Sequence, residues 1–169
     1  MGQRYPRDAE RVWSHGVDVT LADFEALLGM PKLVAVNLNT SNTTDDHLAV
    51  LGQIPTLEDL DLSLTDVTDA GMKHLWPLAR LQHLRIKETS LGDRTLIGLS
   101  HHPLLETLNL KSLPITKSGV RTLANLWSLK LVVFSSIGFE RSVLDDLQQA
   151  LPDCEIVLDG SVFEGRKGH

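Results

Sequence analysis

Residues 57–62 read LEDLDL, residues 81–86 read LQHLRI and residues 105–110 read LETLNL. In each stretch the fourth and sixth residues are aliphatic and the fifth is polar, the alternation that is typical of a β-strand with one buried face. Residues 33–38 and 129–134 carry the same L-x-x-L-x-L pattern with conservative replacements. The sequence therefore predicts five strands at a constant interval of 24 positions.

The same interval organises the residues between the strands. Two apolar columns three positions apart begin at Phe24 and Leu27, and this spacing places both on one face of a short helix. Threonine stands where most of these helices begin and is suited to cap free backbone N–H groups. Asp45 and Asp69 add negative charge in the first turn, where the helix dipole favours it. Each unit then predicts one helix and one strand, and the units begin at Thr20, Thr44, Thr68, Gly92, Thr116 and Glu140.

One helix–strand pair cannot bury its apolar side alone. Stacked copies place every inward column against the equivalent residues of the neighbouring units, which gives a continuous core. We therefore expect an α/β solenoid with a concave parallel β-sheet and short convex helices.

The units also resemble a known family. TDDHLAVLGQIPTLEDLDLSLTDV, residues 44–67, and VTDAGMKHLWPLARLQHLRI, residues 67–86, resemble leucine-rich repeats of the V-T-D-x-G-L-x-x-L kind. Such repeats occur in F-box substrate receptors and in many bacterial proteins. The resemblance implies a right-handed leucine-rich-repeat solenoid that binds a protein partner.

The chain is expected to have three parts. Residues 1–19 are expected to form an N-terminal cap, in which Arg7–Trp13 could be a short helix over the first repeat. Residues 20–159 hold five full repeats with the same period and a partial sixth, whose last strand carries Cys154 in a leucine place. Residues 160–169 are expected to be a flexible tail.

Composition excludes several classes of function. The net charge of −6 argues against nucleic-acid binding and against anionic membrane surfaces, because both require clustered lysine and arginine. No apolar stretch is long enough to span a bilayer, and the N-terminus lacks the apolar middle of a signal peptide. The single cysteine cannot form an intramolecular disulfide, so we expect a cytoplasmic location.

The predicted strands place polar and apolar residues on the concave face, between the inward aliphatic residues. Across the units this face passes from acidic to basic to apolar, and Asp61 and Arg85 are close enough in register to pair. Leu131 and Val133 are either an apolar contact for a partner or are covered by the C-terminal strand and tail. The candidate partner-binding residues are Asp59, Asp61, His83, Arg85, Lys87, Asn109, Lys111, Leu131 and Val133.

Motifs of catalysis or cofactor binding are missing. The sequence holds no His-x-x-x-His, Cys-x-x-Cys, phosphate loop or G-x-S-x-G motif, so we expect no enzyme, no metal and no cofactor. His101 and His102 are expected in an exposed loop before a proline. Trp76 and Trp127 are expected to seal the edge of the core, and Cys154 to be a small buried hydrophobic residue.

The sequence thus predicts a non-catalytic interaction module that holds a protein partner on its concave face. A narrower alternative is an inhibitor or immunity protein of a basic enzyme. Another is a scaffold or accessory subunit of a larger complex. The chain is expected to be a monomer or to self-associate weakly through its C-terminal end.

Overall fold

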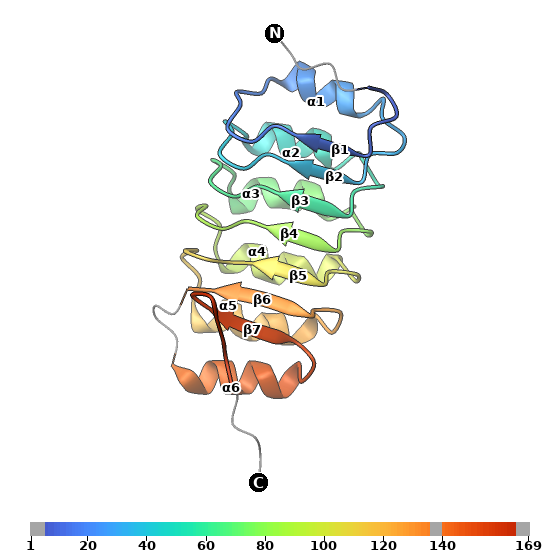
Figure 1. The fold of residues 1–169 in the computed structure, drawn as a ribbon. Helices are drawn as coiled ribbons and strands as arrows, with labels where there is room; N and C mark the ends of the chain where they lie inside the picture. Colours follow the sequence, from blue (N-terminus) through green and yellow to red (C-terminus); the bar gives the residue numbers. More distant parts are fainter. Residues whose placement is uncertain (1–5, 136–139, 165–169) are drawn as a thin grey trace.

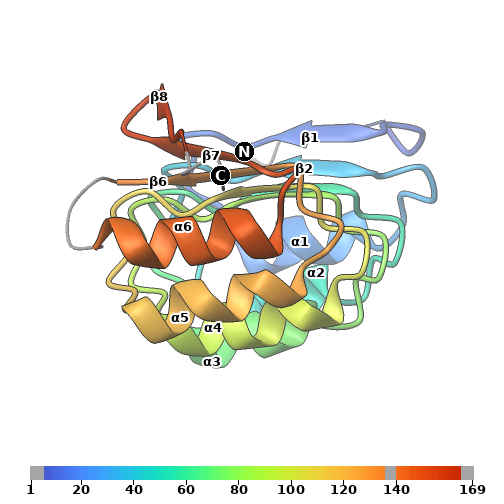
Figure 2. The same ribbon diagram turned by 90° about the horizontal axis from the view of Figure 1, so that it is seen from below.

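The computed structural model describes residues 6–135 and 140–164 of the chain. The described residues form one layer of strands and one layer of helices, and all the helices lie on the same side of the sheet (Figures 1 and 2). The elements in chain order are β1 Arg11–Trp13, α1 Leu21–Leu27, β2 Ala35–Asn37, α2 Asp45–Leu51, β3 Asp59–Asp61, α3 Asp69–Met72, η1 Lys73–Leu75, β4 His83–Arg85, α4 Asp93–Gly98, η2 Leu99–His101, β5 Thr107–Asn109, α5 Lys117–Thr122, η3 Leu123–Asn125, β6 Leu131–Phe134, α6 Arg141–Ala150, β7 Glu155–Leu158 and β8 Ser161–Val162.

The sheet repeats with the predicted interval. Strands β1 to β7 pair in parallel and in chain order, and paired residues are 24 positions apart, so that Leu60 lies beside Leu84 and Leu84 beside Leu108. Each helix connects one strand to the next, as parallel pairing requires. The chain is therefore an α/β solenoid, as the sequence predicts.

The helices begin at the predicted positions. Thr20, Thr44, Thr68, Gly92, Thr116 and Glu140 are the N-caps of α1 to α6. At Thr20 the cap is reciprocal, because the Thr20 hydroxyl accepts from the Asp23 backbone N–H and the Asp23 carboxylate accepts from the Thr20 N–H. This carboxylate also accepts from the Thr20 hydroxyl, and these bonds hold the pKa of Asp23 below its ordinary value.

The aliphatic columns form one continuous core. Leu60 of β3, Leu84 of β4 and Val132 of β6 are each 0% exposed, and the helix residues Leu51 and Leu75 pack against the same cluster. Burying one such side chain contributes roughly 1.5–3 kcal/mol. The stacked columns are thus the main source of stability in the fold.

A second set of contacts joins neighbouring repeats at the helix starts. The Asp45 carboxylate accepts from both the backbone N–H and the hydroxyl of Thr68, at 2.8 and 2.7 Å. A methyl group on Gly71 would lie 2.1 Å from this carboxylate, so the repeat requires glycine there. We call Asp45, Asp69 and Asp93, which make equivalent bonds to the next repeat, the aspartate ladder.

Strands β2 to β5 each lead into the following turn through a residue with a positive φ. Thr40, Leu64, Glu88 and Ser112 have φ angles between 55° and 61° and recur at the same interval as the strands. Residues other than glycine rarely adopt this left-handed conformation because the Cβ atom crowds the backbone. The repeat therefore imposes a strained turn on ordinary side chains.

Both ends of the chain differ from the sequence-based expectation. The helix expected over Arg7–Trp13 is wrong, because Arg11–Trp13 is strand β1 and pairs with β2. The flexible tail is wrong at Ser161 and Val162, which form β8 and pair antiparallel with β7. The last five residues of that tail, 165–169, lie outside the described residues.

Candidate functional site

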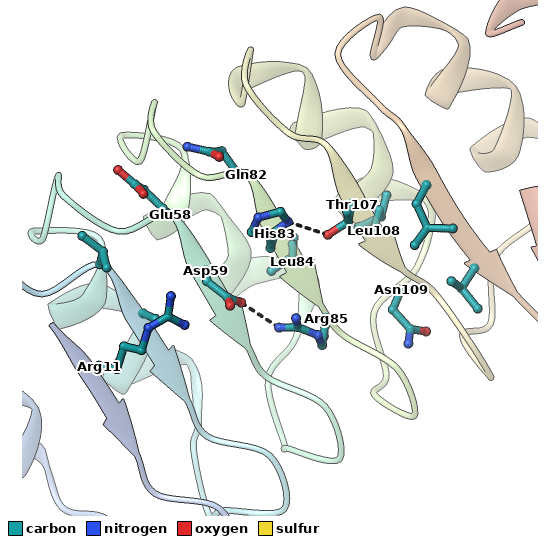
Figure 3. A pocket seen from close by; sticks show the side chains of 14 residues that line it. Arg11, Glu58, Asp59, Gln82, His83, Leu84, Arg85, Thr107, Leu108 and Asn109 are labelled. Carbon is teal, nitrogen blue, oxygen red and sulfur yellow. Dashed lines mark hydrogen bonds and ion pairs between the residues drawn. The ribbon is translucent and has the colours of Figure 1, made fainter. Parts of the chain in front are cut away.

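A hollow of about 500 Å³ lies in the sheet on the face opposite the helices, which we call the open face (Figure 3). Its walls come from strands β1 to β6 and from the residues that lead into them. Alternation along each strand explains this placement, since the middle residue points to the core and its two neighbours point outward. The structure brings six of the predicted site residues together around this hollow: Asp59, His83, Arg85, Asn109, Leu131 and Val133.

An ion pair lies near the centre of the hollow. Arg85 Nη1 is 2.6 Å from Asp59 Oδ1, and both side chains are partly exposed (Figure 3). The pair expected between Asp61 and Arg85 is wrong, although these residues are neighbours in the sheet register. A partly exposed pair of this kind stabilises the fold by about 0–1 kcal/mol, so its two charges mainly shape the surface.

Asp61 forms a hydrogen bond with the backbone instead of an ion pair with Arg85. Its Oδ1 accepts from the Ser63 N–H at 2.9 Å, and the residue is only 7% exposed. Asn37 and Asn109, at the equivalent strand position, accept in the same way from the residue two places later. At this outward position a short polar side chain therefore closes the turn that follows the strand.

His83 is held in place by the neighbouring strand. Its Nδ1 and the Thr107 Oγ1 share a hydrogen bond at 2.8 Å, and both residues are partly exposed (Figure 3). This bond fixes the imidazole ring over β4 and β5. The floor of the hollow is therefore ordered by contacts between side chains of the open face.

Lys87 and Lys111 do not line the hollow. They follow β4 and β5 at the edge where each strand turns toward the next helix. Lys87 Nζ lies 4.0 Å from Glu88 Oε1, and Lys111 Nζ lies 3.9 Å from Asp159 Oδ1 in the turn between β7 and β8. Both lysines therefore have an acidic neighbour.

Leu131 and Val133 form the apolar end of the hollow. Both are partly buried, with β7 beside them in the sheet. β8 pairs with Val157 and Leu158 of β7, one strand further out. The two side chains therefore keep part of their surface on the open face.

Sequence reasoning missed two residues at the other end. Arg11 of β1 reaches into the hollow, and Trp13 is 57% exposed above a smaller hollow of about 110 Å³ beside Asp61 and Arg85. Val12 between them is buried and lies 24 positions before Val36. Extending the strand period by one unit toward the N-terminus would have found this strand.

Two side chains on the helix side, Trp127 and His102, also differ from expectation. Trp127 is 85% exposed and Trp76 is 42% exposed, so the expected sealing of the core is wrong for Trp127. Trp76 stacks on His101 with ring centroids 4.5 Å apart. His102 is buried rather than exposed, and its Nδ1 lies 3.1 Å from the Leu78 carbonyl oxygen.

The described residues show little that suggests catalysis. Cys154 is buried as expected, and loss of water contact raises the pKa of its thiol to about 11, which keeps it protonated at neutral pH. Among residues 6–135 and 140–164, no three His, Cys, Asp or Glu side chains gather as they would around a metal ion. No helix within these ranges has the length and apolar character needed to cross a membrane.

Comparison with known proteins supports the fold. No protein-family model matches the sequence, and no curated protein matches it. Among solved structures, the chain is similar to internalin C2 of Listeria monocytogenes, a leucine-rich-repeat protein, with a TM-score of 0.59 and 21% sequence identity. The match covers 79% of this chain, which spans only 55% of the internalin chain.

Proposed function

We propose that this protein, which has the leucine-rich-repeat fold, is a non-catalytic interaction module and that it binds a protein partner on the open face. The observation that carries this proposal is the hollow of about 500 Å³ in that face. Its walls combine partly buried aliphatic side chains with polar groups fixed by neighbouring strands, which is the composition of a specific interface.

The binding surface in this proposal includes the residues predicted from sequence, with different roles. Leu131 and Val133 provide apolar area. Arg85, His83 and Asn109 provide hydrogen-bond donors, and Lys87 and Lys111 lie along the rim, where charges mainly influence association rate and specificity. Asp59 orients Arg85, and Asp61 acts indirectly by holding the turn that follows β3.

Affinity capture from extracts of the native host tests this proposal. The test variant replaces Arg85, Lys87 and Val133 with alanine on the open face. The matched control replaces Lys73, Arg94 and Ile97 with alanine, which removes two cations and one aliphatic side chain from exposed positions on η1 and α4. We expect the captured partner, once purified, to bind the control like the native chain and the test variant at least about tenfold more weakly. Equal loss in both variants, or loss only in the control, would contradict the proposal.

A second candidate function is an accessory subunit of a larger complex. The exposed Trp127, together with Ile97 at 59% exposure, favours it, because large apolar side chains in water often belong to interfaces. The mass of the purified chain in solution separates the two functions. A stable, well-behaved monomer supports transient binding, whereas a chain that stays soluble only with a companion supports an obligate subunit.

The narrower role as inhibitor or immunity protein of a basic enzyme rests on the net charge of −6. The aspartate ladder weakens this support from net charge, because the carboxylates of Asp45, Asp69 and Asp93 already bond to neighbouring repeats. If this role holds, association with the enzyme must slow steeply as salt rises. A cytoplasmic location stays part of the proposal, because the one cysteine is a free thiol.

A further inference from the structure

The N-terminal strand adds two large side chains to the open face. Arg11 and Trp13 flank the buried Val12 and are both exposed, so strand alternation turns both toward the open face. Among the described residues β1 forms one edge of the sheet, and β8 forms the other. A partner crossing the strands would therefore meet these two side chains at one end.

Arg11 differs from the other cations of this face in its distance from carboxylate groups. Arg85 pairs with Asp59, and Lys87 and Lys111 each have a carboxylate within 4.0 Å. In the described ranges, no carboxylate lies within ion-pair distance of Arg11, although its guanidinium group extends into the hollow (Figure 3). Within residues 6–135 and 140–164, Arg11 is therefore a cation of the hollow that lacks an ionic partner.

The residue between Arg11 and Asp59 leaves room for a ligand group. Ala35 occupies that place on β2, and its small side chain is 5% exposed at the floor of the hollow. Trp13 stands beside the same floor, above the smaller hollow. Arginine and tryptophan are the residue types that most often dominate binding energy, because each offers a large surface and a directed donor.

We propose that Arg11 and Trp13 anchor an extended acidic–aliphatic peptide segment of the protein partner. A carboxylate of the segment pairs with Arg11, and the apolar part of the same residue packs on Trp13. The aliphatic end of the segment contacts Leu131 and Val133 at the far end of the hollow. This inference rests on the proposed function, because it specifies what occupies the open face.

The dimensions of the hollow favour an extended segment. From β1 to β6 there are five strand spacings of about 4.8 Å, which places Arg11 about 24 Å from Leu131. An extended chain covers that span with about seven residues. The lining residues run from Arg11 to Leu131, so an extended segment of this length could contact both ends of the hollow.

The test uses blocked synthetic peptides of about seven residues, the length that matches this span. The acidic probe has two glutamates at one end, three serines and two leucines at the other end. The control probe replaces both glutamates with lysine, and each probe is also made in reverse order because the direction of the bound chain is open. Binding is followed by nuclear magnetic resonance, with the Trp13 indole signal assigned from a Trp13→Phe variant.

We expect one order of the acidic probe to bind at least about tenfold more tightly than the matching lysine probe and to shift the Trp13 signal. Arg11→Glu is expected to reverse the preference, while Arg94→Glu, on the exposed side of α4, leaves it unchanged. Thermal melting of both variants confirms that each is folded.

Equal affinity for the two probes, or no binding of any probe, would overturn this inference. Shifts confined to His83, Leu131 and Val133 with no dependence on Arg11 would overturn it too, but would leave the proposed function standing. Shifts confined to the helices would contradict both.

Discussion

The carboxylate of Asp93 accepts hydrogen bonds from both the backbone N–H and the hydroxyl of Thr116, at 2.8 and 2.5 Å, although the two residues are 23 positions apart. Thr116 is the N-cap of α5. Asp93 therefore stabilises the start of the next helix as well as the first turn of its own. In this way an aspartate in the first turn of one helix links its repeat to the start of the next helix.

Gly119 belongs to the same arrangement and gives the first prediction. A Cβ atom at this position would lie 2.1 Å from Asp93 Oδ1, so Gly119→Ala must displace the carboxylate. We expect this variant to lose about 1–3 kcal/mol of unfolding free energy in chemical denaturation. Asp93→Ala alone removes hydrogen bonds at the surface and is expected to cost about 1 kcal/mol.

The double variant provides the control. Once Asp93 is alanine, Gly119→Ala meets no carboxylate, and alanine is a better helix former than glycine by about 1 kcal/mol. The effect of Gly119→Ala should therefore change from destabilising to neutral or stabilising in the Asp93→Ala background. Additive losses in the double variant would mean that the two sites are not coupled.

Truncation of the core tests the stacked columns. Leu84 is 0% exposed and lies between Leu60 and Leu108. Leu84→Ala is expected to cost on the order of 2–5 kcal/mol and to lower the melting temperature clearly. Leu104→Ala, at 49% exposure, is the matched control and should change stability little. Unchanged melting of Leu84→Ala would contradict the inward position of this column.

Most of the fold could be predicted because each unit carries its own local information. Aliphatic alternation specifies the strand, threonine at positions such as Thr44 and Thr68 specifies the helix start, and the constant interval between units specifies the register. β1 was missed because it forms no complete unit with a preceding helix. Its strand conformation depends on pairing with β2, which is a tertiary contact.

The candidate site was predictable in position but not in detail. The register placed Asp61 beside Arg85, yet the carboxylate of Asp61 bonds to the Ser63 N–H, and Arg85 reaches Asp59 instead. Which acid an arginine contacts depends on side-chain rotamers and on competing backbone donors, which the strand pattern does not specify. Arg11 was missed together with its strand.

Burial of His102 could have been read from the sequence. It falls in a column with Met30, Ile54, Leu78 and Leu126, which are all buried and recur at the interval of the repeat. The adjacent proline suggested an exposed loop, but the position of His102 in this buried column places its side chain in the core. His102 is thus a titratable residue in an aliphatic position of the core.

This placement predicts a dependence of stability on pH. Burial lowers the pKa of His102 in the folded state, although the Leu78 carbonyl opposes this shift. As pH falls through the ordinary histidine value of about 6.5, the unfolded chain takes up a proton that folded His102 does not. Unfolding free energy should therefore fall on acidification until pH reaches the folded-state pKa.

His102→Leu restores an aliphatic residue to this column and is expected to reduce the loss of stability between about pH 8 and about pH 5. His47 also has a pKa lowered by burial, so part of the dependence should remain. His15→Leu, at an exposed position distant in the chain from His102, serves as the control. An identical pH profile in the native chain and His102→Leu would show that this residue titrates normally when folded.

Leu64 gives the last prediction, because it combines a φ angle of 57° with a side chain that is 39% exposed. A leucine in the left-handed region is held there by the repeat, at a cost of about 1–2 kcal/mol relative to its preferred conformations. Glycine adopts this conformation freely but loses more entropy on folding, by up to about 1 kcal/mol. Leu64→Gly should therefore raise unfolding free energy by up to about 1 kcal/mol.

Ser90→Gly, two positions after the positive-φ residue Glu88, is the control and should destabilise the chain, because its backbone φ is not positive. A loss of stability in Leu64→Gly as large as that in Ser90→Gly would mean that the turn after β3 stores no strain and that the contacts of the Leu64 side chain outweigh its backbone conformation.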